Sequence, residues 1–218
     1  MKIAARFVLS AFALVLAGSA HATLVVSDFL TPGDHLLVTD SATGLQWLTP
    51  VYTRNHDYDD SFVQSIIATY GFAYASETQV IDMIDQNFNN PPLDPGTYAG
   101  YQDAAAFLNI FGIAANTVCE VSGDHPPFHP CPRTQGLTST SSSPGTHDGV
   151  GMLYVFNGNA SYGYLIEQNA WLDTGSTDPQ VGSWLVRSIN PVPEPASLAL
   201  AAAGMALLAV RVRLRRRT

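Results

Sequence analysis

Two cysteines and two histidines lie close together in one short stretch of the chain, and these residue types either form a disulfide or bind a metal ion. Cys119 and Cys131 are the two cysteines of the sequence, and His125 and His129 stand between them. A disulfide closing this loop would stabilise the fold by about 3 kcal/mol, mainly by restricting the unfolded chain. Two sulfurs and two imidazoles also form a potential zinc site, although their spacing fits no regular zinc pattern. We expect the disulfide, with no bound metal ion or other cofactor.

Two histidines are each followed directly by an aspartate, an arrangement that can serve general base catalysis. These pairs are His56–Asp57 and His147–Asp148. Neither pair belongs to an HExxH zinc motif or to a Gly-x-Ser-x-Gly nucleophile turn. Both fall in expected loops, where polar residues are commonly solvated. We therefore assign no catalytic residue and expect a protein that is not an enzyme, with a hydrolase of surface glycans or peptides as the alternative.

Acidic and aromatic residues offer two further kinds of binding chemistry. Asp57, Asp59 and Asp60 could bind calcium weakly, but capping of the helix that follows explains them without a metal. Aromatic side chains could stack on sugar rings, although in strands they more often fill the core. The aromatic candidates are Trp47, Trp171, Trp184, Tyr98, Tyr101, Tyr162 and Tyr164. Neither set identifies a ligand by itself.

The elements that would position these residues begin with a hairpin. Residues 35–40 and 45–48 have the composition of short strands. Residues 41–44 between them supply turn chemistry, with Asp40 before the turn and Gly44 at its end. The sequence therefore predicts an antiparallel pair that carries Trp47.

Two helices are predicted next. Residues 57–60 can cap a helix with apolar residues at helical spacing, and Gly71 ends it. Residues 76–79 have the form of a capping box and open a second helix, which the prolines at 91–92 close. Residues 72–75 between the two helices are either a short strand or an extended connector.

A third helix is predicted from Tyr101 to Phe111, with an apolar stripe on one face and Gly112 at its end. Most of the chain beyond it is interpreted as loop, and residues 135–148, rich in Ser, Thr, Gly and Pro, are expected to form a mobile surface segment. A period of two then predicts strands over residues 152–156, 162–167 and 182–187. This order indicates one α+β domain with a mixed, mainly antiparallel sheet and two or three helices.

Three segments of this domain resemble the DUF1566 or Lcl-type family. They are residues 40–48, of the form Asp-x-x-Thr-Gly-Leu-x-Trp, residues 71–80 and the closing residues 184–187. Residues 72–76 replace the Trp-Arg-Leu-Pro-Thr sequence that is typical of the family at the helix entry. The resemblance implies a C-type-lectin-like fold, in which the first and last strands pair, but it does not imply a ligand.

The N-terminus has the form of a secretory signal peptide. Lys2 and Arg6 precede an apolar stretch over residues 7–17, and a small-residue site ends at Ala22. We expect cleavage between Ala22 and Thr23. An uncleaved anchor helix is the alternative, and the short apolar stretch argues against it.

The C-terminus combines three elements in a fixed order. Pro193, Glu194 and Pro195 come first, and an apolar run that predicts a helix over residues 196–212 follows. At about 1.5 Å per residue this run is shorter than the roughly 30 Å hydrocarbon core, which makes it a marginal membrane anchor. The basic tail consists of Arg211, Arg213, Arg215, Arg216 and Arg217. These arginines favour a cytoplasmic tail, with the preceding domain on the far side of the inner membrane.

This order of elements resembles the PEP-CTERM sorting signal of Gram-negative bacteria, over residues 191–218. The resemblance implies recognition by an exosortase, a membrane protease of transpeptidase type that parallels the sortases of Gram-positive bacteria. It also implies that the protein is held in the membrane only until it is processed. An ordinary tail anchor with an accidental Pro-Glu-Pro is the alternative.

Removal of both targeting segments leaves a strongly acidic domain. Residues 23–190 contain three basic residues, Arg54, Arg133 and Arg187, against seventeen acidic ones, a formal charge of −14 compared with −8 for the full chain. Such a charge repels nucleic acids and anionic lipids and attracts cations. Nucleic-acid binding is therefore excluded.

The sequence thus predicts a signal peptide over residues 1–22, an exported α+β domain over 23–190 and a sorting signal over 191–218. We expect a non-enzymatic protein of the cell envelope or extracellular matrix that is sorted by an exosortase-type system and associated with exopolysaccharide or biofilm matrix. A structural surface coat protein is a further alternative. The expected partners are the processing enzyme, the inner membrane through the C-terminal helix, and exopolysaccharide.

Overall fold

The computed structural model describes residues 23–88, 98–120, 128–156, 161–175 and 177–189. The chain divides into two units, Met1–Arg187 and Ser188–Thr218, and the fold is that of the first. The predicted signal peptide, and the predicted sorting signal with its membrane helix over residues 196–212, lie outside the described residues. Within the described ranges no helix is both long and apolar enough to cross a membrane.

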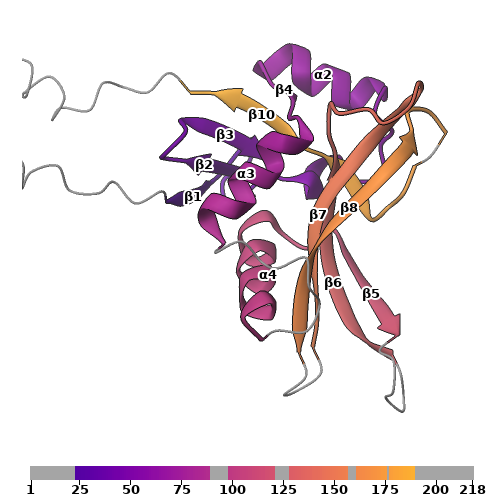
Figure 1. The fold of residues 1–218 in the computed structure, drawn as a ribbon. Coiled ribbons are helices and arrows are strands. Elements are labelled where there is room, and N and C mark those ends of the chain that lie inside the picture. The colour runs from indigo at the N-terminus through magenta and orange to yellow at the C-terminus, as the bar shows by residue number, and fades with distance from the viewer. Residues whose placement is uncertain (1–22, 89–97, 121–127, 157–160, 176, 190–218) are drawn as a thin grey trace, which may run out of the picture. The chain divides into compact units, whose positions relative to one another are not determined.

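The described residues of this unit form two β-sheets and three α-helices (Figure 1), which agrees with the predicted α+β class. The first sheet has the strand order β1-β2-β3-β10-β4, and the second has the order β5-β6-β7-β8, with β9 paired to β6. The helices are α2 (Ser61–Tyr70), α3 (Glu77–Asn87) and α4 (Tyr98–Phe111), and a 3-10 helix, η1, covers Pro50–Thr53. The strands of the first sheet are β1 (Leu24–Ser27), β2 (Leu37–Asp40), β3 (Leu45–Leu48), β4 (Ala73–Tyr74) and β10 (Leu185–Ser188). Those of the second are β5 (Ala115–Glu120), β6 (Phe128–Leu137), β7 (Thr146–Val155), β8 (Tyr162–Leu172) and β9 (Val181–Ser183).

The predicted first hairpin is confirmed as β2 and β3. Its register pairs Asp40 with Leu45, and Oδ1 of Asp40 accepts a hydrogen bond of 2.9 Å from the backbone N–H of Ala42. Gly44 ends the turn with a φ of 67°, a left-handed conformation that a residue with a side chain adopts at a cost. An additional edge strand, β1, pairs with the free side of β2. The sequence pattern gave no prediction of β1.

The two predicted cap motifs are also confirmed. Asp60 caps α2 by accepting from the backbone N–H of Phe62, and Gly71 ends the helix in the left-handed region. Ser76 and Gln79 form a reciprocal capping box at the start of α3. Between the helices, β4 shows that the short-strand alternative was the correct one. The prolines expected to close α3 lie outside the described residues.

The last strands join the two sheets through one buried residue. The strand predicted over residues 182–187 is divided at Trp184 into β9, which pairs with β6 in the second sheet, and β10, which belongs to the first. The Trp184 backbone N–H donates to the carbonyl of Leu137, and its carbonyl accepts from the N–H of Ala75. In the first sheet β10 lies between β3 and β4 and not beside β1. The pairing of first and last strands implied by the lectin-like resemblance is therefore absent from the described sheet.

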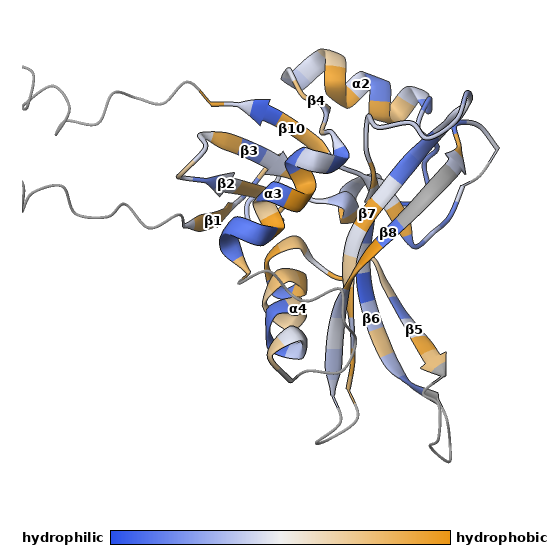
Figure 2. Cartoon of the chain, in the orientation of Figure 1, coloured by the Kyte–Doolittle hydropathy of each residue, from blue (hydrophilic) through white to orange (hydrophobic). Residues whose placement is uncertain are grey.

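The main core lies between the helices α3 and α4 and the two sheets. Trp47 and Trp184 are almost fully buried there, with ring centroids 6.1 Å apart and planes at 90°. Figure 2 shows the apolar sides of α3 and α4 facing the strands. The apolar stripe predicted for the third helix is buried as expected: Ala104, Phe107, Leu108 and Phe111. Periodicity therefore identifies the helical contribution to the core correctly.

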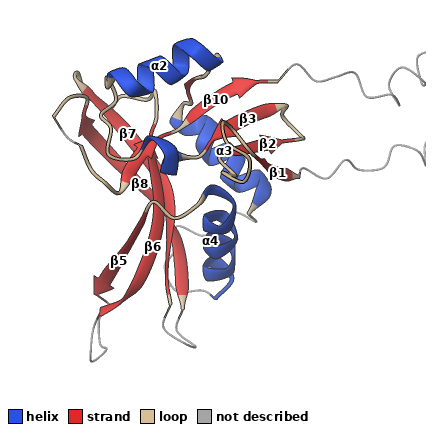
Figure 3. Ribbon diagram, turned by 180° about the vertical axis from the view of Figure 1, so that it is seen from behind, coloured by secondary structure: helices blue, strands red, loops and turns tan. Residues whose placement is uncertain are grey.

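Helix α4 packs closely on the second sheet. Figures 1 and 3 show it beside the lower parts of β7 and β8. A Cβ added to Gly163 of β8 would lie 2.4 Å from the carbonyl oxygen of Gly100 and 2.6 Å from Cβ of Ala104. The glycine is thus required by the close approach of helix and strand.

The region after α4 contradicts the prediction of loops. Residues 115–120 and 128–137 form the strands β5 and β6, and residues 146–148 begin β7. Within the expected surface segment, residues 139 and 141–145 are exposed, whereas Thr138 is fully buried. Its side chain donates to the carbonyl of Asp148 at 2.9 Å. Polar residues are buried here because their hydrogen bonds are satisfied inside the protein, which a hydropathy pattern does not reveal.

The disulfide between Cys119 and Cys131 is present, with the two Cα atoms 5.7 Å apart. It joins β5 and β6, whose register places Cys119 opposite His129 and Cys131 opposite Thr117. Both sulfurs are therefore unavailable to the alternative zinc site, and His125 lies outside the described residues. The interpretation of the chain between the cysteines as loop is wrong for residues 128–130, which belong to β6.

Candidate functional site

The residues assigned to sorting and processing lie at the ends of the chain. Ala22, the Pro193-Glu194-Pro195 segment and the arginine tail are outside the described residues. Thr23 is the first described residue, and its backbone N–H donates to Oγ of Ser41 at 3.0 Å. The geometry of the described residues therefore concerns only the exported domain.

In the structure, the histidine of each suggested His-Asp pair contacts a different aspartate from the one that follows it in the sequence. Nδ1 of His147 lies 2.5 Å from Oδ1 of Asp173, which stands 26 residues further along the chain. The pair forms because β7 and β8 are antiparallel and place His147 opposite Trp171, two residues before Asp173. An ionised carboxylate only accepts, so Nδ1 of His147 carries the proton in this contact. In the neutral ring Nε2 is then a potential base.

A tyrosine covers one face of this histidine. The ring of Tyr58 is stacked on His147 at a centroid distance of 3.5 Å and on Tyr74, on its other side, at 4.0 Å. The hydroxyl of Tyr74 donates to the carbonyl of Tyr58 at 2.6 Å. Burial raises the pKa of Tyr58, and the negative charges of Asp173 and Asp59 raise it further. Both tyrosines are thus uncharged phenols at neutral pH.

The chemistry available to this cluster is general base catalysis without an associated nucleophile. A His-Asp pair with a fixed tautomer can accept a proton from water or from a substrate hydroxyl. Within the described residues no serine, threonine or cysteine side chain is hydrogen-bonded to His147. Side-chain exposures of 16% for His147 and 18% for Asp173 leave the pair only narrowly open to solvent. Asp173, Tyr58 and Tyr74 could not be found from sequence motifs, because the strand register brings Asp173 to His147 and ring stacking between segments distant in the sequence brings the two tyrosines.

The other pair, His56–Asp57, belongs to the start of α2. Nδ1 of His56 lies 3.1 Å from Oδ2 of Asp60, and its ring stacks on Phe62. Hydrogen bonds from the backbone N–H of Phe62 and from His56 lower the pKa of Asp60. Asp57 accepts from the backbone N–H of Gly175 at 2.7 Å. These contacts favour the capping interpretation of the aspartates over a calcium site. Among the described residues no group of three His, Cys, Asp or Glu side chains is placed to bind a metal.

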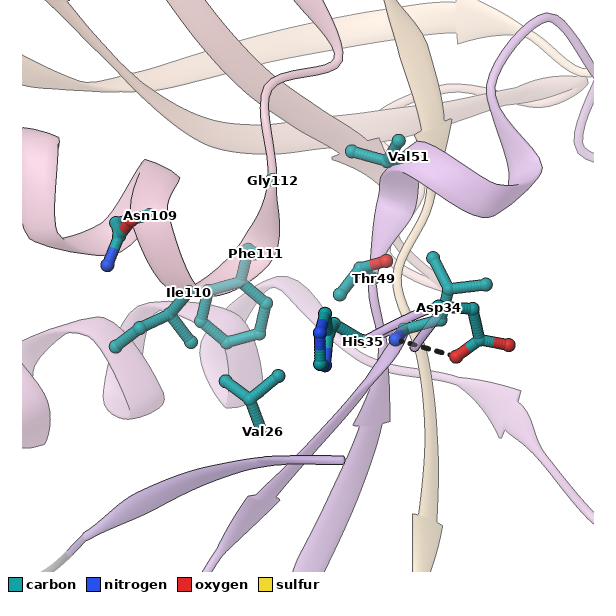
Figure 4. Close-up of a pocket in the computed structure, with 10 residues that line it drawn as sticks. Val26, Asp34, His35, Thr49, Val51, Asn109, Ile110, Phe111 and Gly112 are labelled. Carbon is teal, nitrogen blue, oxygen red and sulfur yellow. Dashed lines mark hydrogen bonds between the residues drawn. The ribbon is translucent and has the colours of Figure 1, made fainter. Parts of the chain in front are cut away.

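A cavity of about 380 Å³ lies between the start of β2 and the end of α4. Figure 4 shows Val26, His35, Thr49, Ile110 and Phe111 around it. The size is that of a small-molecule site, but the polar groups at the wall are few.

Asp34, the carboxylate of this wall, has a structural role. It accepts hydrogen bonds from several backbone N–H groups, including Phe29 at 2.8 Å and Leu30 at 2.9 Å. Loss of contact with water acts to raise its pKa, but these bonds outweigh that effect and lower the pKa to about 2. The carboxylate therefore holds the loop before β2 and leaves the cavity without a catalytic acid.

The aromatic candidates divide into core and surface residues. Trp47 and Trp184 are core residues, in agreement with the expectation that aromatic side chains in strands more often fill the core. Tyr162 and Tyr164 are only half-buried, on one face of β8, with ring planes within 16° of parallel and centroids 6.2 Å apart. Burial raises the pKa of Tyr164, and the charge of Arg133 lowers it to a smaller extent. These two rings are the aromatic pair best suited to stack on a ligand. The side chain of Tyr98 is not described.

Residues 191–217 match the family model described as the PEP-CTERM protein-sorting motif. The match confirms the predicted sorting signal, and it implies export, transient anchoring in the membrane and processing by an exosortase. Neither a curated protein nor a solved structure matches the chain. The resemblance of the domain to the DUF1566 family thus gains no support. The roles of single residues in the signal and the cleavage after Ala22 stay predictions.

Proposed function

We propose that this protein works outside the inner membrane as a non-enzymatic component of the cell envelope or extracellular matrix, in association with exopolysaccharide. The sorting motif over residues 191–217 is the observation that carries the proposal, because it defines the route of the protein. The export implied by this motif brings the domain into reach of surface polysaccharide.

The intact mass of the mature protein, isolated from its host, tests the route. We expect a form that begins at Thr23 and ends within residues 193–195. A protein that retains the arginine tail would contradict processing by an exosortase. A form that begins at Met1 would contradict cleavage of the signal peptide but would not bear on the sorting motif.

Glycan binding is proposed to use the parallel rings of Tyr162 and Tyr164. Aromatic faces stack on the C–H faces of sugars, and these two near-parallel rings lie close together on one strand. We would test this role of the two tyrosines by measuring how the mature protein binds to a glycan array and to purified host exopolysaccharide. We expect the Tyr162→Ala and Tyr164→Ala variants to lose most of the binding, whereas Tyr70→Ala, an exposed tyrosine on α2, retains it. Equal binding by all variants would place the glycan elsewhere, and self-assembly without any glycan binding would favour a surface coat.

A hydrolase is the second candidate function, and the His147–Asp173 contact is the observation that favours it. The mature protein should then hydrolyse surface glycans or peptides, and His147→Ala should abolish turnover. His56→Ala is the matched control, because His56 contacts the cap of α2 and has no part in this pair. A substrate screen without turnover, with a correctly folded protein, would count against the hydrolase.

A further inference from the structure

A small cavity of about 100 Å³ lies between the first hairpin and helix α3. Figure 1 shows α3 crossing the strands β2 and β3 there. The polar side chains at the cavity are those of Asp40, Thr43, Trp47, Gln79, Asp82 and Gln86. The volume holds about three water molecules, at roughly 30 Å³ each, and is too small for a drug-sized ligand.

Two of the residues that line the cavity, Asp40 and Trp47, each have a buried polar side-chain atom without a hydrogen-bond partner. Asp40 is fully buried, and its Oδ2 has no hydrogen-bond partner, whereas Oδ1 is held by the backbone N–H groups of Ala42 and Thr43. Trp47 is 1% exposed, and its Nε1–H also has no partner. A buried carboxylate oxygen without a donor is costly, so a bound species that supplies positive charge or a hydrogen bond stabilises this arrangement.

Another part of the cavity wall is formed by one face of α3. Gln79, Asp82, Met83 and Gln86 recur at the spacing of a single helix face. The amide oxygen of Gln79 already accepts from the backbone N–H of Ser76, so that Asp82 and Gln86 supply the free oxygen ligands. Asp40 and Asp82 therefore approach the cavity from opposite walls.

Among the residues that the structure describes, no arginine is paired with these carboxylates. The three arginines of residues 23–190 have other partners. Arg54 donates to the carbonyl of Ala114, Arg133 to Gln180 and Arg187 to Gln46. The formal charge of −14 over these residues favours the entry of a cation from solution.

We infer that this cavity binds a calcium ion together with a few waters. Calcium prefers mixed oxygen ligands, so Oδ2 of Asp40, a carboxylate oxygen of Asp82, the amide oxygen of Gln86 and water complete a suitable set. The Nε1–H of Trp47 donates to an ion-bound water. The ion links the β2–β3 hairpin to α3, and the affinity is that of extracellular calcium modules, with a Kd on the order of 0.1–1 mM.

The experiment uses the mature protein after removal of metal ions with a chelator. Thermal unfolding is followed as calcium is added, and terbium luminescence excited through tryptophan reports a lanthanide next to Trp47. We expect a saturable rise in Tm with calcium, a smaller rise with magnesium, and terbium luminescence that calcium competes away.

Asn at position 40 retains the Oδ1 acceptor of the turn but replaces Oδ2 by a donor. Asp40→Asn should therefore weaken calcium binding at least about tenfold while the hairpin persists. Asp82→Asn, on the surface of α3, should weaken calcium binding with no effect on folding. Asp85→Asn is the control, because it removes a carboxylate from the same helix away from the cavity. If Asp40→Asn does not fold, Asp82→Asn decides.

Two results would overturn the inference. One is the absence of a saturable calcium effect in the unaltered protein. The other is an equal effect in the Asp82→Asn and Asp85→Asn proteins. Saturable binding of a neutral sugar at the cavity, independent of calcium, would show that hydroxyl groups fill it instead.

Discussion

The indole Nε1–H of Trp184 donates a hydrogen bond of 2.8 Å to the carbonyl oxygen of Val150, inside the core. Trp184 stands between β9 and β10, and Val150 belongs to β7, so the bond connects the residue at the junction of the sheets to the centre of the second sheet. Trp47, which meets Trp184 edge to face, has no partner for its own Nε1–H. Two buried tryptophans in contact thus differ in one hydrogen bond.

This difference gives a matched pair of substitutions. Trp184→Phe and Trp47→Phe remove the same atoms from the same core, but only the first removes a formed hydrogen bond. We expect Trp184→Phe to lower the free energy of unfolding by about 1 kcal/mol more than Trp47→Phe, in metal-free buffer. Urea denaturation of both proteins measures this, and equal losses would show that the bond contributes nothing net.

The disulfide is expected to stabilise the pairing of β5 and β6. Replacement of both Cys119 and Cys131 by Ser should lower the free energy of unfolding by about 3 kcal/mol, because the unfolded chain regains the freedom of the closed loop. Denaturation of the unaltered protein with and without reductant is the control. Thiol titration of the unfolded protein should find no free thiol, and two titratable thiols without reductant would contradict the bond.

Asp34 should make the stability of the folded protein depend on pH. Its pKa in the folded protein is about 2, below the ordinary value of 3.8, because backbone N–H groups donate to the ionised form. The folded state therefore binds fewer protons than the unfolded state between these values. The contribution of Asp34 is complete above pH of about 4 and is lost as the pH falls toward 2.

Asp34→Asn removes this dependence, because the amide does not titrate and one of its two acceptor atoms is replaced by a donor. We expect the variant to be less stable at pH 6 and to lose less stability than the unaltered protein between pH 4 and 2. Acid unfolding curves of the two proteins provide the comparison. Parallel curves would show that Asp34 has its ordinary pKa.

The contact of α4 with β8 should not tolerate a methyl group. Gly163→Ala would place Cβ within 2.4 Å of the carbonyl oxygen of Gly100, so that the helix must move. We expect a loss of about 1–3 kcal/mol, typical of overpacking. Gln102→Ala, on the exposed side of the same helix, is the control and should be nearly neutral. An unchanged Tm for Gly163→Ala would mean that the helix adjusts without cost.

The helices and the first hairpin could be predicted because their signals are local. Asp60, Ser76 and Gly71 mark helix ends by their own hydrogen bonds and backbone conformation, and these marks operate within a few residues. The strands β5 and β6 could not be predicted, because their pattern is broken by prolines and by buried polar residues such as Thr134, whose partners are distant in the sequence. The same holds for the contact of His147 with Asp173, which depends on the register of β7 and β8.

The position of β10 between β3 and β4 also bears on the order of events during export. Residues 185–188 are the last strand that the structure describes, and until this strand has crossed the membrane the edges of β3 and β4 that pair with it stay open. Pairing between such remote segments is slow, because the chain between them must be ordered before their contacts form. The sorting motif begins at residue 191, so for a chain exported unfolded and N-terminus first, the strand that closes the first sheet and the processing signal would reach the membrane almost together.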